Sequence, residues 1–168
     1  MSGLRQTMPA ALLLLVAAVF QGRLAHSLAV HGAQPDFVLV TLACGATLIG
    51  GSAGIGLGLW AGLLTAALVP QTLGTFLASR LAGGAFAGWL AGSVIQRSLI
   101  VPPLAALATT VVTELVYVLM APTHHLRAWA TAVAGEALCN MVWAVPIFLL
   151  LRRLGIGHKP DDPFGQYS

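Results

Sequence analysis

Polar residues are so sparse along this chain that six apolar stretches follow one another with only short breaks. The stretches lie near residues 8–28, 37–50, 53–70, 73–95, 99–120 and 128–151. A helix needs about 20 apolar residues to cross the roughly 30 Å hydrocarbon core of a bilayer. The chain lacks the alternation of apolar and polar residues that a membrane β-barrel requires. The pattern therefore predicts an all-α membrane protein, a polytopic bundle of about six transmembrane helices.

The composition strengthens this prediction, since 58% of the residues are hydrophobic and only 8% are charged. We expect residues 1–168 to form a single integral membrane domain that ends in a tail over 155–168. Too little chain then lies outside the membrane for a soluble catalytic domain. The net charge is +3, but the basic residues are scattered singly, which argues against nucleic-acid binding.

The basic residues are better interpreted as topology signals. Six spans place both termini on one side, which then carries five basic residues against two on the other (Arg5, Arg97, Arg152, Arg153 and Lys159 against Arg23 and Arg127). Positive charge is retained on the cytoplasmic side of membranes. We therefore expect both termini to be cytoplasmic, with Asp36 and the pair His124 and His125 facing outward.

The first apolar stretch admits two interpretations. Arg5, an apolar run and the segment Ala25-His26-Ser27 together fit a cleaved secretory signal peptide. The alternative is a retained helix with Arg23 snorkelling toward the headgroups. We favour the retained helix, because polytopic bacterial proteins seldom need a cleaved signal.

Glycines recur every fourth residue on two successive spans. One stripe lies on the third span and the other on the fourth (Gly54, Gly58 and Gly62; Gly84, Gly88 and Gly92). Small residues at this spacing let helix backbones approach closely. They predict close packing of these two helices on each other or on a partner helix.

Prolines are expected to shape two further helices. Pro102 and Pro103 lie near the start of the fifth span, and Pro146 lies within the sixth. Because proline has no backbone N–H and its ring clashes with the preceding turn, we expect kinks in both helices.

Three ionisable residues fall inside predicted spans, namely Arg80, Glu114 and Glu136. Counted from the nearest span ends, each lies about 10 Å deep at about 1.5 Å per residue, so all three occupy one layer. One guanidinium can hold two carboxylates, which predicts an ionic clasp between three helices. A polar surface for a partner helix and a substrate or proton site are the alternatives. Asn140 and Trp143 share a helix stripe with Glu136 and extend this polar seam.

Other chemistry has little support in the sequence. Cys44 and Cys139 lie in apolar spans without a Cys-x-x-Cys partner, which indicates small core residues. Four histidines near the outer face lack a recurrent ligand spacing, so we expect no metal and no cofactor. No phosphate-binding loop, nucleophile elbow or zinc-protease motif occurs, and we expect no enzymatic activity.

Taken in order, the motifs resemble those of the bacterial rod shape-determining membrane protein MreD family. The resemblance begins with Gln34-Pro35-Asp36 before an apolar span and continues through the glycine-rich third span at 54–64. It then includes Leu73-Gly74 and the segment 81–84, and ends with Glu136, Asn140, Trp143 and Pro146 before Arg152-Arg153. It covers about residues 30 to 154. Thr65 is a departure, because members often carry an acidic residue just after the Gly-Leu-Leu of the third span.

The resemblance implies a non-enzymatic scaffold in the bacterial inner membrane. It would bind the membrane-anchored protein MreC and join the cell-wall elongation complex with the actin-like MreB, the polymerase RodA and a transpeptidase. That complex directs lateral peptidoglycan synthesis and rod shape. The alternative is a substrate-binding membrane subunit of an energy-coupling-factor vitamin transporter, a class of six-helix proteins to which the MreD family is similar in fold.

Overall fold

The computed structural model describes residues 2–24, 27–29, 33–69, 73–93 and 100–157. Within these ranges the regular structure is entirely helical, which confirms the predicted all-α fold class. The helices are α1 (Ser2–Leu24), α2 (Phe37–Ile49), α3 (Gly51–Leu68), α4 (Leu73–Ser93), α5 (Val101–Met120) and α6 (Leu126–Arg153). Among the described residues, α1, α3, α5 and α6 are long and apolar enough to cross a membrane.

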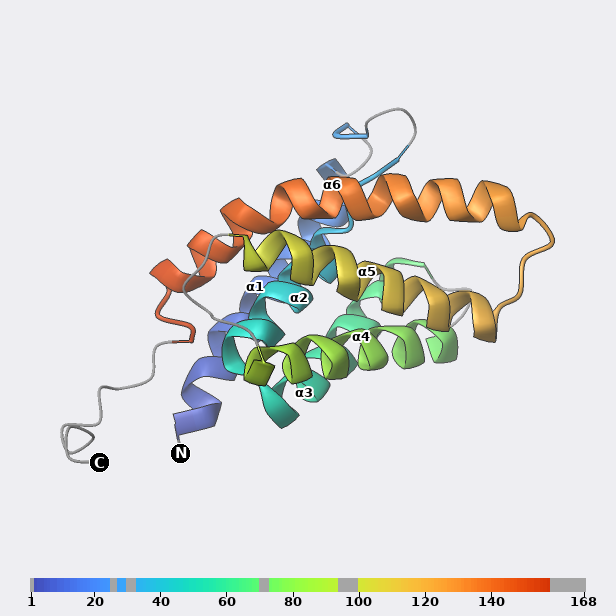
Figure 1. Cartoon of the computed structure of the whole chain (residues 1–168). Helices are drawn as coiled ribbons and strands as arrows, with labels where there is room; N and C mark the ends of the chain where they lie inside the picture. Colours follow the sequence, from blue (N-terminus) through green and yellow to red (C-terminus); the bar gives the residue numbers. More distant parts are fainter. Residues whose placement is uncertain (1, 25–26, 30–32, 70–72, 94–99, 158–168) are drawn as a thin grey trace.

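The bundle has two distinct ends (Figure 1). The first residues of α1 and the last residues of α6 lie at one end, which we call the terminal end. The connection between α5 and α6, residues 121–125, lies at the opposite end, which we call the loop end. His124 and His125 are exposed there.

Helix α2 forms the centre of the bundle and packs against each of the other five helices. Its residues from Phe37 to Leu48 are all buried. The largest fully buried side chains around it are apolar and come from α1, α2 and α6, including Leu14, Leu39, Leu42, Phe148 and Leu151. A helix that is apolar on all sides apart from Thr41 and Thr47 is typical of a core position with no lipid-facing side.

The expected span at 37–50 needs correction, because α2 is too short to cross a membrane. Its 13 residues measure about 20 Å at about 1.5 Å per residue, against a hydrocarbon core of roughly 30 Å. Pro35 and Asp36, directly before it, are buried in the bundle, and Ala33 packs so closely on α6 that a Cβ at Gly135 would lie 2.6 Å from it. Asp36 is consequently buried, at 9% exposure, rather than facing outward as the sequence suggested.

Helices α3 and α4 meet along the two glycine stripes. A Cβ added at Gly58 would lie 2.6 Å from the carbonyl oxygen of Arg80, and one at Gly54 would lie 2.5 Å from that of Gly84. Gly62 and Gly88 are similarly close to α4 and α3 backbone. Gly92 lies near the end of α4. We call this interface between α3 and α4 the glycine seam. Within it the two stripes face each other rather than a partner helix.

The prolines behave differently in the two helices. Helix α5 begins at Val101, so Pro102 and Pro103 lie in its first turn, where backbone N–H groups have no intrahelical acceptor. The expected kink at this point is therefore wrong, since these prolines start the helix without disturbing it. Pro146 lies inside α6, and α6 changes direction in its C-terminal half (Figure 1).

Candidate functional site

Arg80 of α4 is the centre of a buried polar cluster. Its side chain is 5% exposed, and its Nη2 atom donates a hydrogen bond to Oδ2 of Asp36. Its Nη1 atom lies 3.8 Å from Oε1 of Glu114 on α5. A single guanidinium thus holds carboxylates from two other parts of the chain, the arrangement that burial of a charge in a membrane protein requires.

Asp36 connects this ion pair to the start of α2. Its Oδ1 atom accepts a hydrogen bond from the backbone N–H of Leu39 at 2.8 Å, which makes Asp36 the N-cap of α2. The partial positive charge of a helix N-terminus stabilises a carboxylate at this position. One side chain therefore fixes both the start of the central helix and the position of Arg80.

Two amides satisfy the backbone that enters the bundle before α2. Asn140 of α6 accepts from the Asp36 N–H at 2.8 Å and donates to Oγ1 of Thr110 at 3.0 Å. Gln21 of α1 accepts from the Phe37 N–H at 2.7 Å and donates to the Pro35 carbonyl at 3.2 Å. Irregular backbone at membrane depth is tolerated only where protein groups satisfy it in this way. We call Gln21, Asp36, Arg80, Thr110, Glu114, Glu136 and Asn140 the polar cluster.

The clasp predicted from the sequence differs in its partners. Within the described residues Arg80 forms ion pairs with Asp36 and Glu114, whereas Glu136 forms none. Glu136 instead accepts a long hydrogen bond from Nδ2 of Asn140 at 3.5 Å. The physical reason is the path of the chain before α2, which brings Asp36 into the position expected for Glu136.

Trp143 also differs from its expected role in the polar seam of α6. Its ring packs edge to face on Phe37, with the ring centroids 5.3 Å apart.

Cys44 is buried and Cys139 is half-buried. Thr65 is buried and donates to the Ala61 carbonyl of its own helix at 2.9 Å.

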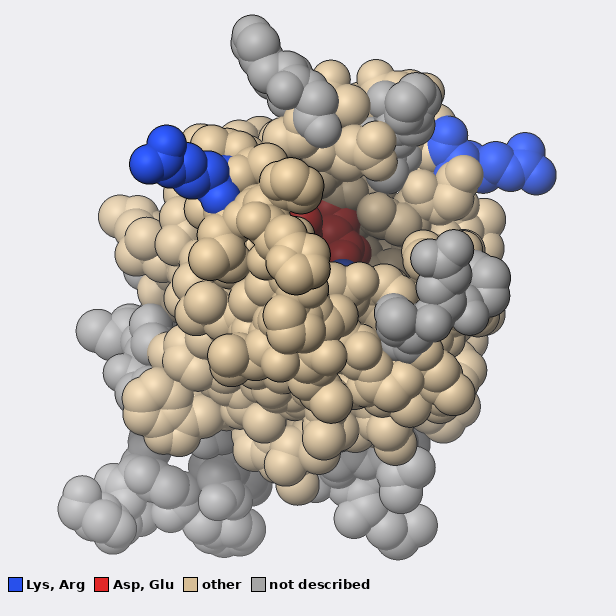
Figure 2. Space-filling view, turned by 90° about the vertical axis from the view of Figure 1, so that its right-hand side faces the viewer, with Lys and Arg blue, Asp and Glu red and all other residues tan. Residues whose placement is uncertain are grey.

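A hollow opens over the polar cluster at the loop end (Figure 2). Figure 2 views the molecule from that end and shows acidic atoms at the bottom of a recess, with Lys or Arg side chains only at the outer edges of this face. The acidic residues that the structure describes are Asp36, Glu114 and Glu136, so the acidic floor of the hollow belongs to the polar cluster. The cluster is accessible from one end of the bundle.

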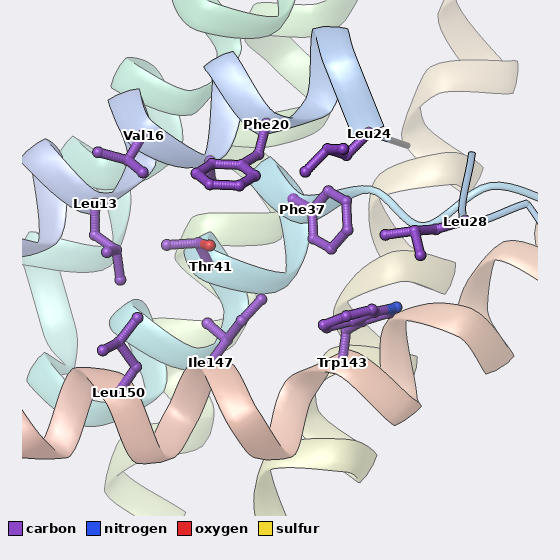
Figure 3. A pocket seen from close by; sticks show the side chains of 11 residues that line it. Leu13, Val16, Phe20, Leu24, Leu28, Phe37, Thr41, Trp143, Ile147 and Leu150 are labelled. Atoms are coloured by element: carbon purple, nitrogen blue, oxygen red, sulfur yellow. The ribbon is translucent and has the colours of Figure 1, made fainter. Parts of the chain in front are cut away.

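A second depression lies on the side of the bundle between α1 and α6 (Figure 3). Both helices pack on α2, but they make little contact with each other. The resulting cavity has a volume of about 280 Å³. We call it the α1–α6 groove, and its lining is apolar except for the Thr41 hydroxyl (Leu13, Val16, Ala17, Phe20, Leu24, Leu28, Phe37, Thr41, Trp143, Ile147 and Leu150).

Sequence reasoning missed the groove and three members of the polar cluster, namely Gln21, Asp36 and Thr110. Gln21 lies one turn from the end of a long apolar stretch, and an uncharged polar residue within a span was the signal for it. The sequence predicts an outward-facing position for Asp36, whereas the structure buries it. The groove had no signal in the sequence, since its lining residues are ordinary apolar residues from three helices.

The fold and these sites define a helical protein with several membrane-length apolar helices, a polar cluster inside the bundle and an apolar groove on its side. Comparison with known proteins gives no match to a family model, to a curated protein or to a solved structure.

Proposed function

We propose that this chain is a non-enzymatic scaffold of the bacterial cell-wall elongation complex and that it binds the membrane-anchored protein MreC. The MreD-like order of motifs supports this proposal. The observation that carries it furthest is the α1–α6 groove, because an apolar groove at membrane depth suits a hydrophobic helix of another protein. The glycine seam is filled by α3 and α4 themselves, so the groove is the better surface for a partner.

The groove offers a continuous apolar face along α1. Leu13, Val16, Phe20 and Leu24 follow one another at helical spacing, and Val16 and Phe20 are about half exposed. The floor is the buried helix α2 at Phe37 and Thr41. Interfaces between membrane helices depend on close van der Waals packing, and a groove already formed between two helices supplies a large surface for it.

The test is co-purification of an MreC-like protein in mild detergent. Val16→Trp fills the groove and is expected to reduce the recovered partner at least about tenfold, which corresponds to about 1.4 kcal/mol. Val19→Trp is the matched control, because Val19 lies on the same helix, is 63% exposed and does not line the groove. Equal recovery with both variants would assign the partner to another surface.

The cellular consequence of the proposal is a change of shape. Depleting the protein from a rod-shaped organism with no second copy is expected to give swollen or spherical cells. Retained rod shape after depletion would refute the scaffold function.

Orientation is part of the same proposal, with the chain in the inner membrane and both termini in the cytoplasm. The distribution of Lys and Arg supports this orientation. Reporter fusions after Ser168 are expected to be cytoplasmic, and fusions between Thr123 and Leu126 are expected to be external. Alkaline phosphatase activity of a C-terminal fusion would contradict it.

The hollow at the loop end favours a second candidate function. A recess with acidic groups at its bottom (Figure 2) suits the substrate-binding subunit of an energy-coupling-factor vitamin transporter. Binding of a vitamin by the purified chain, together with co-purification of transporter ATPases in place of an MreC-like protein, would support this function over the scaffold.

A further inference from the structure

Glu136 is an ionisable group of the polar cluster that has no ion-pair partner among the described residues. Its carboxylate lies beside Asn140 in the polar cluster, yet no cation of the described residues comes within ion-pair distance of it. The cluster as a whole holds three carboxylates and one guanidinium. Ionisable groups inside membrane proteins are normally paired, so a further positive charge would complete this site.

The polar cluster and the neighbouring face of α5 also contain donors without acceptors among the described residues. The Nε and Nη1 atoms of Arg80, a residue 4% exposed, have no hydrogen-bond partner among the described residues. The hydroxyls of Thr109 and Thr113 on α5 are fully buried and also lack one. The great majority of buried polar groups in proteins have a hydrogen-bond partner. An oxygen acceptor next to Arg80 would give some of these donors a hydrogen-bond partner.

Aromatic residues lie between the cluster and the loop end. Phe76 is one turn before Arg80 on α4, Tyr117 is one turn after Glu114 on α5, and their ring centroids are 5.3 Å apart. Trp129 lies two turns before Glu136 on α6, and its buried Nε1 atom has no partner among the described residues. Aromatic faces attract cations as well as apolar groups.

We propose that the hollow binds a small organic cation. Its ammonium group lies against Glu136 and Glu114, a neighbouring hydroxyl or carbonyl oxygen accepts from Arg80 Nη1, and its apolar part contacts Phe76, Tyr117 and Trp129. An organic cation fits better than a metal ion, because the described residues include no group of three or more side chains suited to hold one. The proposal does not depend on MreC binding or on the scaffold function.

The probe for this site is phenylalaninol, which joins an ammonium, a hydroxyl and a phenyl ring. Its neutral counterpart is 3-phenylpropan-1-ol, which lacks only the ammonium. Binding to the purified full chain in detergent is measured by ligand-observed NMR and calorimetry. We expect phenylalaninol to bind at least about tenfold more tightly than the neutral compound, and Glu136→Gln to remove at least about tenfold of its affinity, because hydrogen bonds between charged groups are the stronger ones.

A second pair of variants tests the proposal even if the Glu136→Gln protein does not fold. Trp129→Leu is expected to weaken phenylalaninol binding severalfold, whereas Trp89→Leu leaves it unchanged, because Trp89 is 68% exposed on α4. Equal affinity for the two compounds, or no binding of phenylalaninol to the folded wild-type chain, would overturn the proposal. Binding of a lysine-containing peptide without binding of phenylalaninol would assign the hollow to a protein side chain and would also overturn it.

Discussion

The glycine seam and the polar cluster both hold helices together, and they do so by opposite means. In the seam, the nearest α4 atoms to Gly54 and Gly58 of α3 are backbone atoms. In the cluster, Asp36, Arg80 and Asn140 join the start of α2 to α4 and α6 through long-range polar contacts. The seam depends on glycines that have no side chain, whereas the cluster depends on polar side chains that contact one another.

This difference predicts opposite sensitivities to mutation. An added methyl group has no room in the seam, because neighbouring backbone cannot move aside cheaply. A removed polar group leaves a charge or a backbone donor in the cluster without a partner inside a low-dielectric bundle. The variants below separate the two regions.

Removal of the Arg80 guanidinium is expected to have the largest effect. Arg80→Ala leaves Asp36 and Glu114 buried without their cation, and breaking a buried ion pair in this way costs about 3–5 kcal/mol. The measurement is thermal unfolding of the purified protein and its abundance in membranes. Arg153→Ala, at an exposed position in the last turn of α6, is the control. Equal stability of the two variants would show that Arg80 does not hold the cluster together.

Addition of one methyl group to the seam is expected to have an intermediate effect. Gly58→Ala places a Cβ 2.6 Å from the Arg80 carbonyl, and overpacking of this kind costs about 2 kcal/mol. Gly56→Ala lies half a turn away with nothing within 4 Å of its Cβ, and it is expected to be neutral or slightly stabilising, because alanine favours helix. Unfolding temperatures of the two variants give the comparison, and a Gly58→Ala protein as stable as Gly56→Ala would contradict the observed seam.

Removal of one amide is expected to have the smallest effect of the three. Gln21→Leu leaves the Phe37 N–H and the Pro35 carbonyl without their protein partner, at a cost of about 1 kcal/mol at this half-buried site. Val19→Leu, on an exposed face of α1, serves as control. Hydrogen exchange at Phe37 is the sharper readout, and we expect it to accelerate only in Gln21→Leu.

The prediction of each region from sequence succeeded to a different degree. The glycine seam follows from two stripes of period four on helices that are adjacent in the chain. Their spacing predicted close packing on each other or on a partner helix, and the structure shows that they pack on each other. The polar cluster was only partly foreseen. Arg80, Glu114 and Asn140 were singled out as intramembrane polar residues, but Asp36 was placed in an external loop and Gln21 was not considered.

Local pattern by itself determined the helical class of this protein, because apolar runs of membrane length leave a helix as the only economical way to satisfy the backbone. The tertiary structure alone decided that α2 begins inside the bundle, that Arg80 pairs with Asp36 rather than Glu136, and that α1 and α6 leave a groove between them. The physical reason is separation along the chain. Asp36, Arg80 and Asn140 lie tens of residues apart, and only the packing of all six helices brings their side chains within hydrogen-bonding reach.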